Sequence, residues 1–196
     1  MKKVLVLNGS PRPNGNTRTL SEAFITRCIQ RSYEVKRYNI SDALYFLGSV
    51  YFISFAFGEI VKLCFSDIYK CIYVFLIAFI TDTYAYIAGN LIGKHNITDI
   101  SPKKTWEGSI VGSIMGGIIG SLYYYNIVGD ISLIRVILMS FFLTILCEIG
   151  DLVFSSIKRY FNKKDYSNII PGHGGILDRF DSVIFVALGL VLILSL

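Results

Sequence analysis

Acidic residues within or beside long apolar stretches are the first feature of chemical interest. Asp82 lies midway along one such stretch, and Glu148 and Asp151 lie near the end of another. Ionisable side chains are costly inside a bilayer and mark functional sites there. The polar segment that follows adds Asp165, Asp178 and Asp181. Because carboxylate oxygens are the ligands that Mg²⁺ prefers, the pattern predicts a divalent-cation site at one face of a membrane.

Basic side chains occupy the same polar segments. They are Lys103, Lys104, Lys158, Arg159, Lys164 and Arg179. Ammonium and guanidinium groups suit phosphate oxygens, so carboxylates and cations together indicate Mg²⁺-assisted phosphoryl or nucleotidyl transfer to a lipid. The charges alone agree equally well with interhelical salt bridges and with loops anchored at the cytoplasmic face of a membrane.

The apolar stretches that must position these residues have the length of membrane spans. Of the 196 residues, 53% are apolar and only 17% are charged, which favours a membrane protein over a soluble domain. We predict an all-α polytopic membrane protein with about five transmembrane helices. The expected spans are residues 43–63, 71–92, 108–127, 132–153 and 182–196.

The polar connections set the expected orientation. Residues 93–107 and 154–181 are richer in lysine and arginine than the alternate connections, so the positive-inside rule places both in the cytoplasm. The cysteines form no CxxC pair, and three of the four lie in apolar stretches. Buried thiols are therefore expected rather than a zinc site or a disulfide framework.

One span carries a regular glycine pattern. Gly108, Gly112, Gly116 and Gly120 recur every fourth residue, and such a face lets another helix approach closely in lipid. We interpret it as a packing surface, through which the helix of residues 108–127 could also form a homodimer.

The first 42 residues differ in character from the rest. They hold the whole net charge of +5, and the absence of a basic stripe after them argues against nucleic-acid binding. An apolar strand from Val4 to Leu7, the loop GSPRPNGN, a helix from Thr17 and a strand near residues 33–40 make a short βαβ-like fragment. A single unit of this size buries too little surface to be an independent domain.

The loop of this fragment resembles the flavin-phosphate loop that opens flavodoxin-like NAD(P)H-dependent FMN reductases. Its backbone N–H groups and the helix that follows would suit a phosphate. The resemblance covers residues 1–42 and implies, as an alternative function, a membrane-tethered FMN-dependent reductase fragment. A non-catalytic membrane subunit is the other alternative.

The segment SSIKRYFNKKDYSNIIPGHGGILDRFD, residues 155–181, decides between the two interpretations of the charges. It resembles the signature of phosphatidate cytidylyltransferases, also called CDP-diacylglycerol synthases. The blocks DTYAYIAG from Asp82, SPKKTWEG from Ser101 and GDL from Gly150 agree with the same family. The resemblance covers residues 43–196, which would form the membrane-embedded catalytic region and match the C-terminal half of the family.

The resemblance implies transfer of a cytidylyl group from CTP to phosphatidic acid, giving CDP-diacylglycerol and pyrophosphate in phospholipid biosynthesis. It implies a multi-pass protein of the cell (inner) membrane, with Mg²⁺ held by Asp151 and Asp178. The implied catalytic residues are Asp151, Asp178, Asp181, Lys158, Arg159 and His173. The implied substrate-binding residues are Asp82, Lys103, Lys104, Lys164, Asp165, Arg179, Gly172, Gly174 and Gly175. The family's N-terminal spans are missing, so we expect a truncated or fused chain whose activity depends on whether residues 43–196 suffice.

Overall fold

A computed structural model describes residues 3–8, 16–31, 34–98, 101, 104–167 and 175–195. The chain divides into two units, Met1–Phe55 and Ala56–Leu196, which are considered separately below. The elements are, in chain order, β1 (Lys3–Asn8), α1 (Asn16–Gln30), β2 (Glu34–Asn39), α2 (Ile40–Ser66), α3 (Ile68–Ile92), α4 (Trp106–Tyr123), the π-helical turn η1 (Tyr124–Val128), α5 (Leu133–Tyr160) and α6 (Leu177–Ser195).

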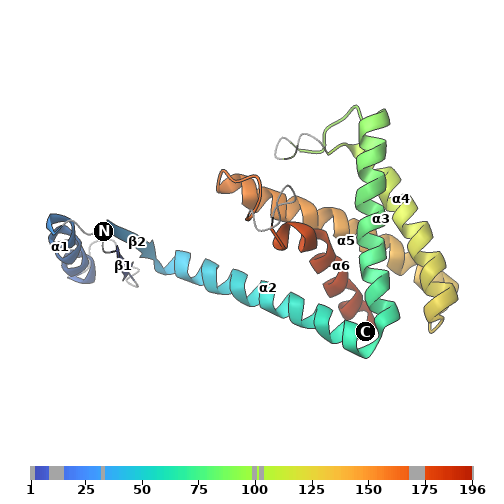
Figure 1. The fold of residues 1–196 in the computed structure, drawn as a ribbon, viewed down its shortest axis with the longest axis horizontal. Coiled ribbons are helices and arrows are strands. Elements are labelled where there is room, and N and C mark those ends of the chain that lie inside the picture. Colours follow the sequence, from blue (N-terminus) through green and yellow to red (C-terminus); the bar gives the residue numbers. More distant parts are fainter. Residues whose placement is uncertain are drawn as a thin grey trace. The chain divides into compact units, whose positions relative to one another are not determined.

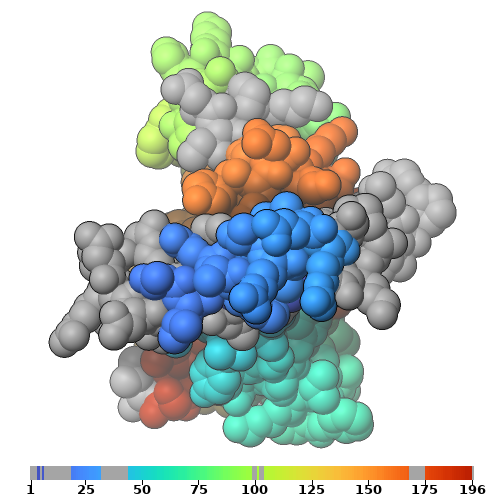
Figure 2. All heavy atoms as spheres, turned by 90° about the vertical axis from the view of Figure 1, so that its left-hand side faces the viewer, coloured from blue at the N-terminus to red at the C-terminus, as the bar shows by residue number. Residues whose placement is uncertain are grey.

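The described part of the first unit contains two short strands, α1 and the first part of α2. Strands β1 and β2 pair in parallel, with Val4 opposite Val35, and α1 connects them. Ile25 and Cys28 of α1 are buried, whereas Leu20 and Phe24 are exposed. Figure 2 shows α1 in blue. Residues 9–15, on which the flavin-phosphate interpretation depends, lie outside the described residues. The expected boundary between residues 42 and 43 stays a prediction, and α2 runs through that position without a break.

The helices confirm the expected all-α polytopic membrane architecture. Among the described residues, four helices are long and apolar enough to cross a membrane, and they cover residues 44–66, 68–92, 106–128 and 133–160. The fifth expected span corresponds to α6. Its first five residues include Asp178, Arg179 and Asp181, so its apolar part is shorter than those of the other four helices.

Helices α3 and α4 pack side by side as an antiparallel pair (Figure 1). The glycine face of α4 is the contact surface. A Cβ atom on Gly108 would lie 2.5 Å from the carbonyl oxygen of Ala85, and one on Gly112 would lie 2.6 Å from that of Thr81. The glycines therefore serve packing within the chain. Because α3 already covers this face, the structure does not support the expected homodimer contact through residues 108–127.

The core of the second unit is formed by α3, α5 and α6 with the end of α2. Ile77, Val136, Leu143, Ile184 and Leu190 are almost completely buried there. Some polar groups inside this core are paired, as where the hydroxyls of Tyr73 and Ser140 lie 2.7 Å apart. The arrangement fixes α5 between α4 and α6, and α5 carries much of the site described below.

The end of the bundle where α2 meets α3 contains a disulfide between Cys64 and Cys71. The expectation of free thiols is wrong at these two positions. Asp67 alone separates the two helices and caps the start of α3, so the chain reverses within one residue and brings the cysteines together. Cys28 and Cys147 remain buried free thiols, as expected.

Candidate catalytic site

The C-terminal half of α5 carries a line of polar side chains. Glu148, Asp151, Ser155 and Lys158 follow one another at spacings of three and four residues, which places them on one face of a helix. The Ser155 hydroxyl donates a hydrogen bond of 3.2 Å to Asp151. The helix continues to Tyr160, so Ser155 and Lys158 extend from a helix rather than from the polar connection that the sequence predicts for residues 154–181.

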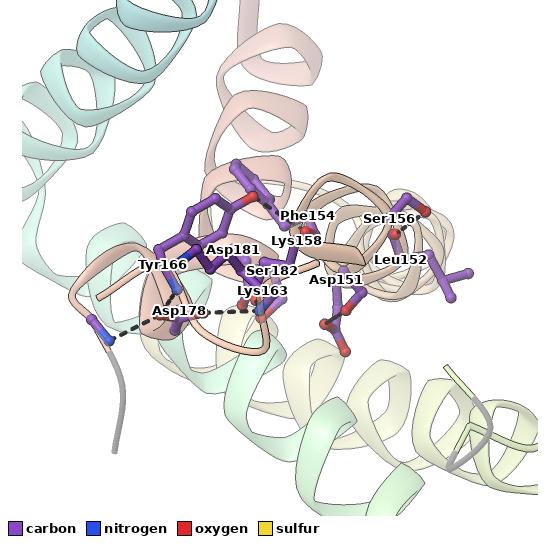
Figure 3. A network of polar contacts seen from close by, with 12 residues as sticks. Asp151, Leu152, Phe154, Ser156, Lys158, Lys163, Tyr166, Asp178, Asp181 and Ser182 are labelled. Carbon is purple, nitrogen blue, oxygen red and sulfur yellow. Dashed lines mark hydrogen bonds and ion pairs between the residues drawn. The ribbon is translucent and has the colours of Figure 1, made fainter. Parts of the chain in front are cut away.

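Lys158 joins α5 to the first turns of α6. Its ammonium nitrogen lies 3.0 Å from Asp178 and 3.5 Å from Asp181 (Figure 3). Only 12% of the lysine side chain, 7% of Asp178 and 11% of Asp181 are exposed. One ammonium group is thus shared by two carboxylates in a nearly dry environment, where each interaction is stronger than at a surface.

Asp178 also organises the chain just before α6. Its second oxygen accepts hydrogen bonds of 2.9 Å from the backbone N–H groups of Tyr166 and Gly175. Burial acts to raise the pKa of Asp178, but these N–H groups and Lys158 outweigh it and hold the pKa below its usual value. A Cβ atom on Gly175 would lie 2.6 Å from the Ser167 hydroxyl, so a larger residue there would require that side chain to move. Gly175 therefore positions Asp178.

Lys104 forms the second lysine–carboxylate cluster. Its ammonium nitrogen lies 2.6 Å from Asp151 and 3.6 Å from Glu148, both on α5. Burial acts to lower the pKa of Lys104, but the attraction of Asp151 and Glu148 outweighs it and raises the pKa. The ammonium group is therefore charged at neutral pH.

The connection between α3 and α4 holds Lys104 in place. Asn96 and Thr105 form an antiparallel bridge, and the Ile97 N–H donates to the Lys104 carbonyl at 2.9 Å. The Thr105 side chain caps α4 by accepting from the Gly108 N–H. The Glu107 carboxylate contacts the His95 ring, 2.6 Å away, and so connects α4 to the segment that follows α3. Lys104 consequently projects from a hairpin whose described ends, residues 95–97 and 104–107, are held together by these contacts.

Asp82 lies on α3, close to both clusters. It accepts a hydrogen bond of 2.9 Å from the Ser182 hydroxyl and a weaker one from the Cys147 thiol, whose sulfur is 3.6 Å away. It is close enough to interact electrostatically with Lys104 and Asp151. Its two oxygens thus accept hydrogen bonds from α5 and α6, and Asp82 supports the site from α3.

The structure brings together many, though not all, of the residues predicted from sequence. Asp82, Lys104, Asp151, Lys158, Gly175, Asp178 and Asp181 belong to the two clusters or contact them. Arg159, Lys164, Asp165 and Arg179 are exposed at the rim. Lys103, Gly172, His173 and Gly174 lie outside the described residues.

Supporting residues that were not predicted include Ser109, Tyr166 and Ser182. The Ser109 hydroxyl donates to Glu148 at 3.0 Å, and the Tyr166 hydroxyl donates to the Phe154 carbonyl at 3.2 Å. Ser182 directly follows Asp181, and a small polar residue beside a carboxylate in an apolar stretch was a usable signal. Ser109 gave none, because it looks like part of the small-residue face of α4.

The carboxylates fit a magnesium ion in donor type and in charge. Glu148, Asp151, Asp178 and Asp181 face two ammonium groups, which leaves two formal negative charges unbalanced among these six side chains. One divalent cation would balance them, and oxygen ligands suit Mg²⁺. Within the described ranges, however, no three acidic, histidine or cysteine side chains already surround a common point. In the structure Asp151 and Asp178 each contact a lysine.

Comparisons with known proteins all match the chain to cytidylyltransferases. The profile of the cytidylyltransferase family matches residues 14–196. The phosphatidate cytidylyltransferase of Staphylococcus haemolyticus (strain JCSC1435) is 40% identical over 151 residues, which cover 76% of this chain and 58% of that protein. The phosphatidate cytidylyltransferases of Staphylococcus saprophyticus and Staphylococcus aureus are each 38% identical with the same coverage. The match spans less than two thirds of the length of these relatives.

Proposed function

The chain belongs to the cytidylyltransferase family, and we propose that it transfers a cytidylyl group from CTP to phosphatidic acid. The products are CDP-diacylglycerol and pyrophosphate. The observation that carries the proposal is the pair of buried lysine–carboxylate clusters along one face of α5, at the end of a membrane-spanning bundle. Such a site can hold a phosphorylated nucleotide next to a lipid headgroup. The family match does not favour the alternative of a flavin-dependent reductase.

In the proposed reaction a phosphate oxygen of phosphatidic acid attacks the α-phosphorus of CTP. A new P–O bond forms to the lipid, and the bond between the α-phosphorus and the bridging oxygen breaks to release pyrophosphate. Lys104 and Lys158 neutralise negative charge on the phosphates as it shifts towards the leaving group. Their helix and hairpin supports hold these ammonium groups in place before the substrates arrive, which lowers the cost of orientation.

Asp151 and Asp178 are the proposed magnesium ligands, with Asp181 beside them. Bound Mg²⁺ would polarise phosphate oxygens and offset their charge. Asp178 retains its two backbone N–H donors in either state, so its orientation does not depend on the lysine alone.

The remaining predicted residues have proposed roles at the rim. Arg159, Lys164 and Arg179 are exposed there, where long basic side chains can contact the triphosphate or the lipid phosphate. We propose the same role for Lys103, a substrate-binding role for Asp165, and a phosphate-binding turn for residues 171–175, which includes His173 and the glycines Gly172, Gly174 and Gly175.

We further propose that the site end of the bundle faces the cytoplasm of a cell (inner) membrane. CTP is a cytoplasmic nucleotide, and the lysine- and arginine-rich connections lie at this end. The Cys64–Cys71 disulfide is near the other end of α3, roughly 30 Å away by the rise of a helix. Disulfides persist in oxidising compartments, which supports an outward orientation for that end.

In intact cells, a membrane-impermeant thiol reagent should label these cysteines only after reduction. Labelling that requires rupture of the membrane would contradict the orientation.

The function is tested with the purified chain in mixed micelles containing phosphatidic acid, Mg²⁺ and CTP labelled at the α-phosphate. We expect label to enter the lipid fraction, and Asp178→Asn to reduce the rate at least 100-fold. Glu59→Gln is the matched control, since Glu59 is an acidic residue of a membrane helix whose salt-bridge partner, Lys62, lies on the same helix. Unlabelled lipid under all lipid and metal conditions would refute the proposal for this chain.

A further inference from the structure

We infer that Glu148 is a positioning residue that takes over the Lys104 ammonium group when Asp151 binds a divalent cation. The inference rests on the proposed function, in which Asp151 is a metal ligand. It explains why a second carboxylate lies beside a lysine–aspartate pair that is already complete.

The geometry provides two alternative partners for one ammonium group. Glu148 and Asp151 are three residues apart on α5 and therefore neighbours on its surface. Lys104 Nζ is 2.6 Å from Asp151 Oδ2 and 3.6 Å from Glu148 Oε2. Lysine has a flexible four-carbon stem and three N–H donors, so a small rotation exchanges the two carboxylates without moving the backbone.

Glu148 has unused capacity to accept this group. Its Oε2 atom accepts one hydrogen bond, from the Ser109 hydroxyl at 3.0 Å. Its Oε1 atom is buried and has no hydrogen-bond partner among the residues that the structure describes. A buried carboxylate oxygen without a partner is costly, and an ammonium group moving towards Glu148 would satisfy it.

The exchange resolves a conflict at Asp151. Lys104 contacts the Oδ2 atom of Asp151 most closely, so a cation bound to this oxygen would meet the ammonium group. A lysine with no other partner would compete with the cation for that oxygen, or would be left buried and unpaired. Glu148 removes this penalty and keeps the positive charge of Lys104 inside the site.

The test measures binding of Mn²⁺, a spectroscopic substitute for Mg²⁺, to the purified full chain by electron paramagnetic resonance, without CTP or lipid. We expect Glu148→Gln to weaken Mn²⁺ binding roughly tenfold, the lower end of the effect of removing a side chain that orients a metal ligand. Lys104→Met should tighten binding, because the competing cation is gone. Glu148→Asp retains the charge but shortens the side chain away from Lys104, and we expect it to weaken binding as well.

The double variant separates positioning from general electrostatics. If Glu148 acts through Lys104, adding Glu148→Gln to Lys104→Met changes Mn²⁺ affinity by less than about twofold, whereas loss of a nearby negative charge would act equally in both backgrounds. An equal effect in both backgrounds, or no Mn²⁺ binding to the unmodified chain, overturns the inference. The readout does not require turnover, so a chain that shows the coupling but transfers no label from CTP would refute only the proposed function.

Discussion

Lys158 provides a strong test of how the site is held together, and we predict that Lys158→Met destabilises the protein. Methionine replaces the apolar stem of the side chain with one of equal length but removes the ammonium group. Asp178 and Asp181 would then remain as two buried carboxylates without their shared counter-ion. The helix α5 would lose its ionic connection to α6.

The size of the effect follows from the surroundings of the two carboxylates. Removing one partner from a buried ion pair costs about 3–5 kcal/mol. Asp178 keeps its hydrogen bonds from the Tyr166 and Gly175 N–H groups, so the lower value applies. For a chain of this length, about 3 kcal/mol corresponds to a decrease in Tm of roughly 6–12 °C. Adding Asp181→Asn removes one uncompensated charge and should restore part of the loss.

Thermal unfolding in detergent measures this decrease. A thiol-reactive dye reports it, because Cys147 is completely buried in the folded protein. Lys163→Met is the matched control, since that side chain is exposed and should change the free energy of unfolding by less than about 0.5 kcal/mol. A Tm of Lys158→Met that equals the Tm of Lys163→Met would refute the proposed role of the shared ammonium group.

Two further predictions concern the scaffold and the response to acid. Gly112→Ala places a Cβ atom 2.6 Å from a backbone carbonyl of α3 and should lower the free energy of unfolding by about 1–3 kcal/mol. Gly58→Ala is the control, because the added atom meets open space and should not destabilise the protein. Equal Tm values for the two variants would contradict this. Because the pKa of Asp178 is lowered on folding, its contribution to stability is present at neutral pH and is lost as the pH falls below about 4. The acid-induced decrease in Tm should therefore be smaller in Asp178→Asn, and an unchanged acid profile would contradict the assignment.

The membrane helices were predictable because long apolar stretches constrain the chain strongly. The expected span 71–92 corresponds to α3, and all of 132–153 except its first residue lies within α5. The ends were less predictable. Helix α5 continues to Tyr160 through residues that hydropathy assigns to a loop, since Ser155 and Lys158 face polar partners while Phe154 packs into the core.

The members of the site were predictable from residue types and from the family signature, but their pairing was not. Which carboxylate contacts Lys104 depends on how the hairpin before α4 lies against α5, a tertiary contact that leaves no local pattern. The disulfide was missed for a related reason. Cys64 and Cys71 look like ordinary buried residues until the one-residue reversal at Asp67 brings them together.

Position-specific labelling of CTP tests the central claim most directly. The purified chain is supplied with phosphatidic acid, Mg²⁺ and CTP labelled at either the α- or the γ-phosphate. Cytidylyl transfer predicts that the α-label enters the lipid and the γ-label appears in pyrophosphate, in equal molar amounts. A γ-label in the lipid, or label in neither product at any substrate concentration, would contradict the account.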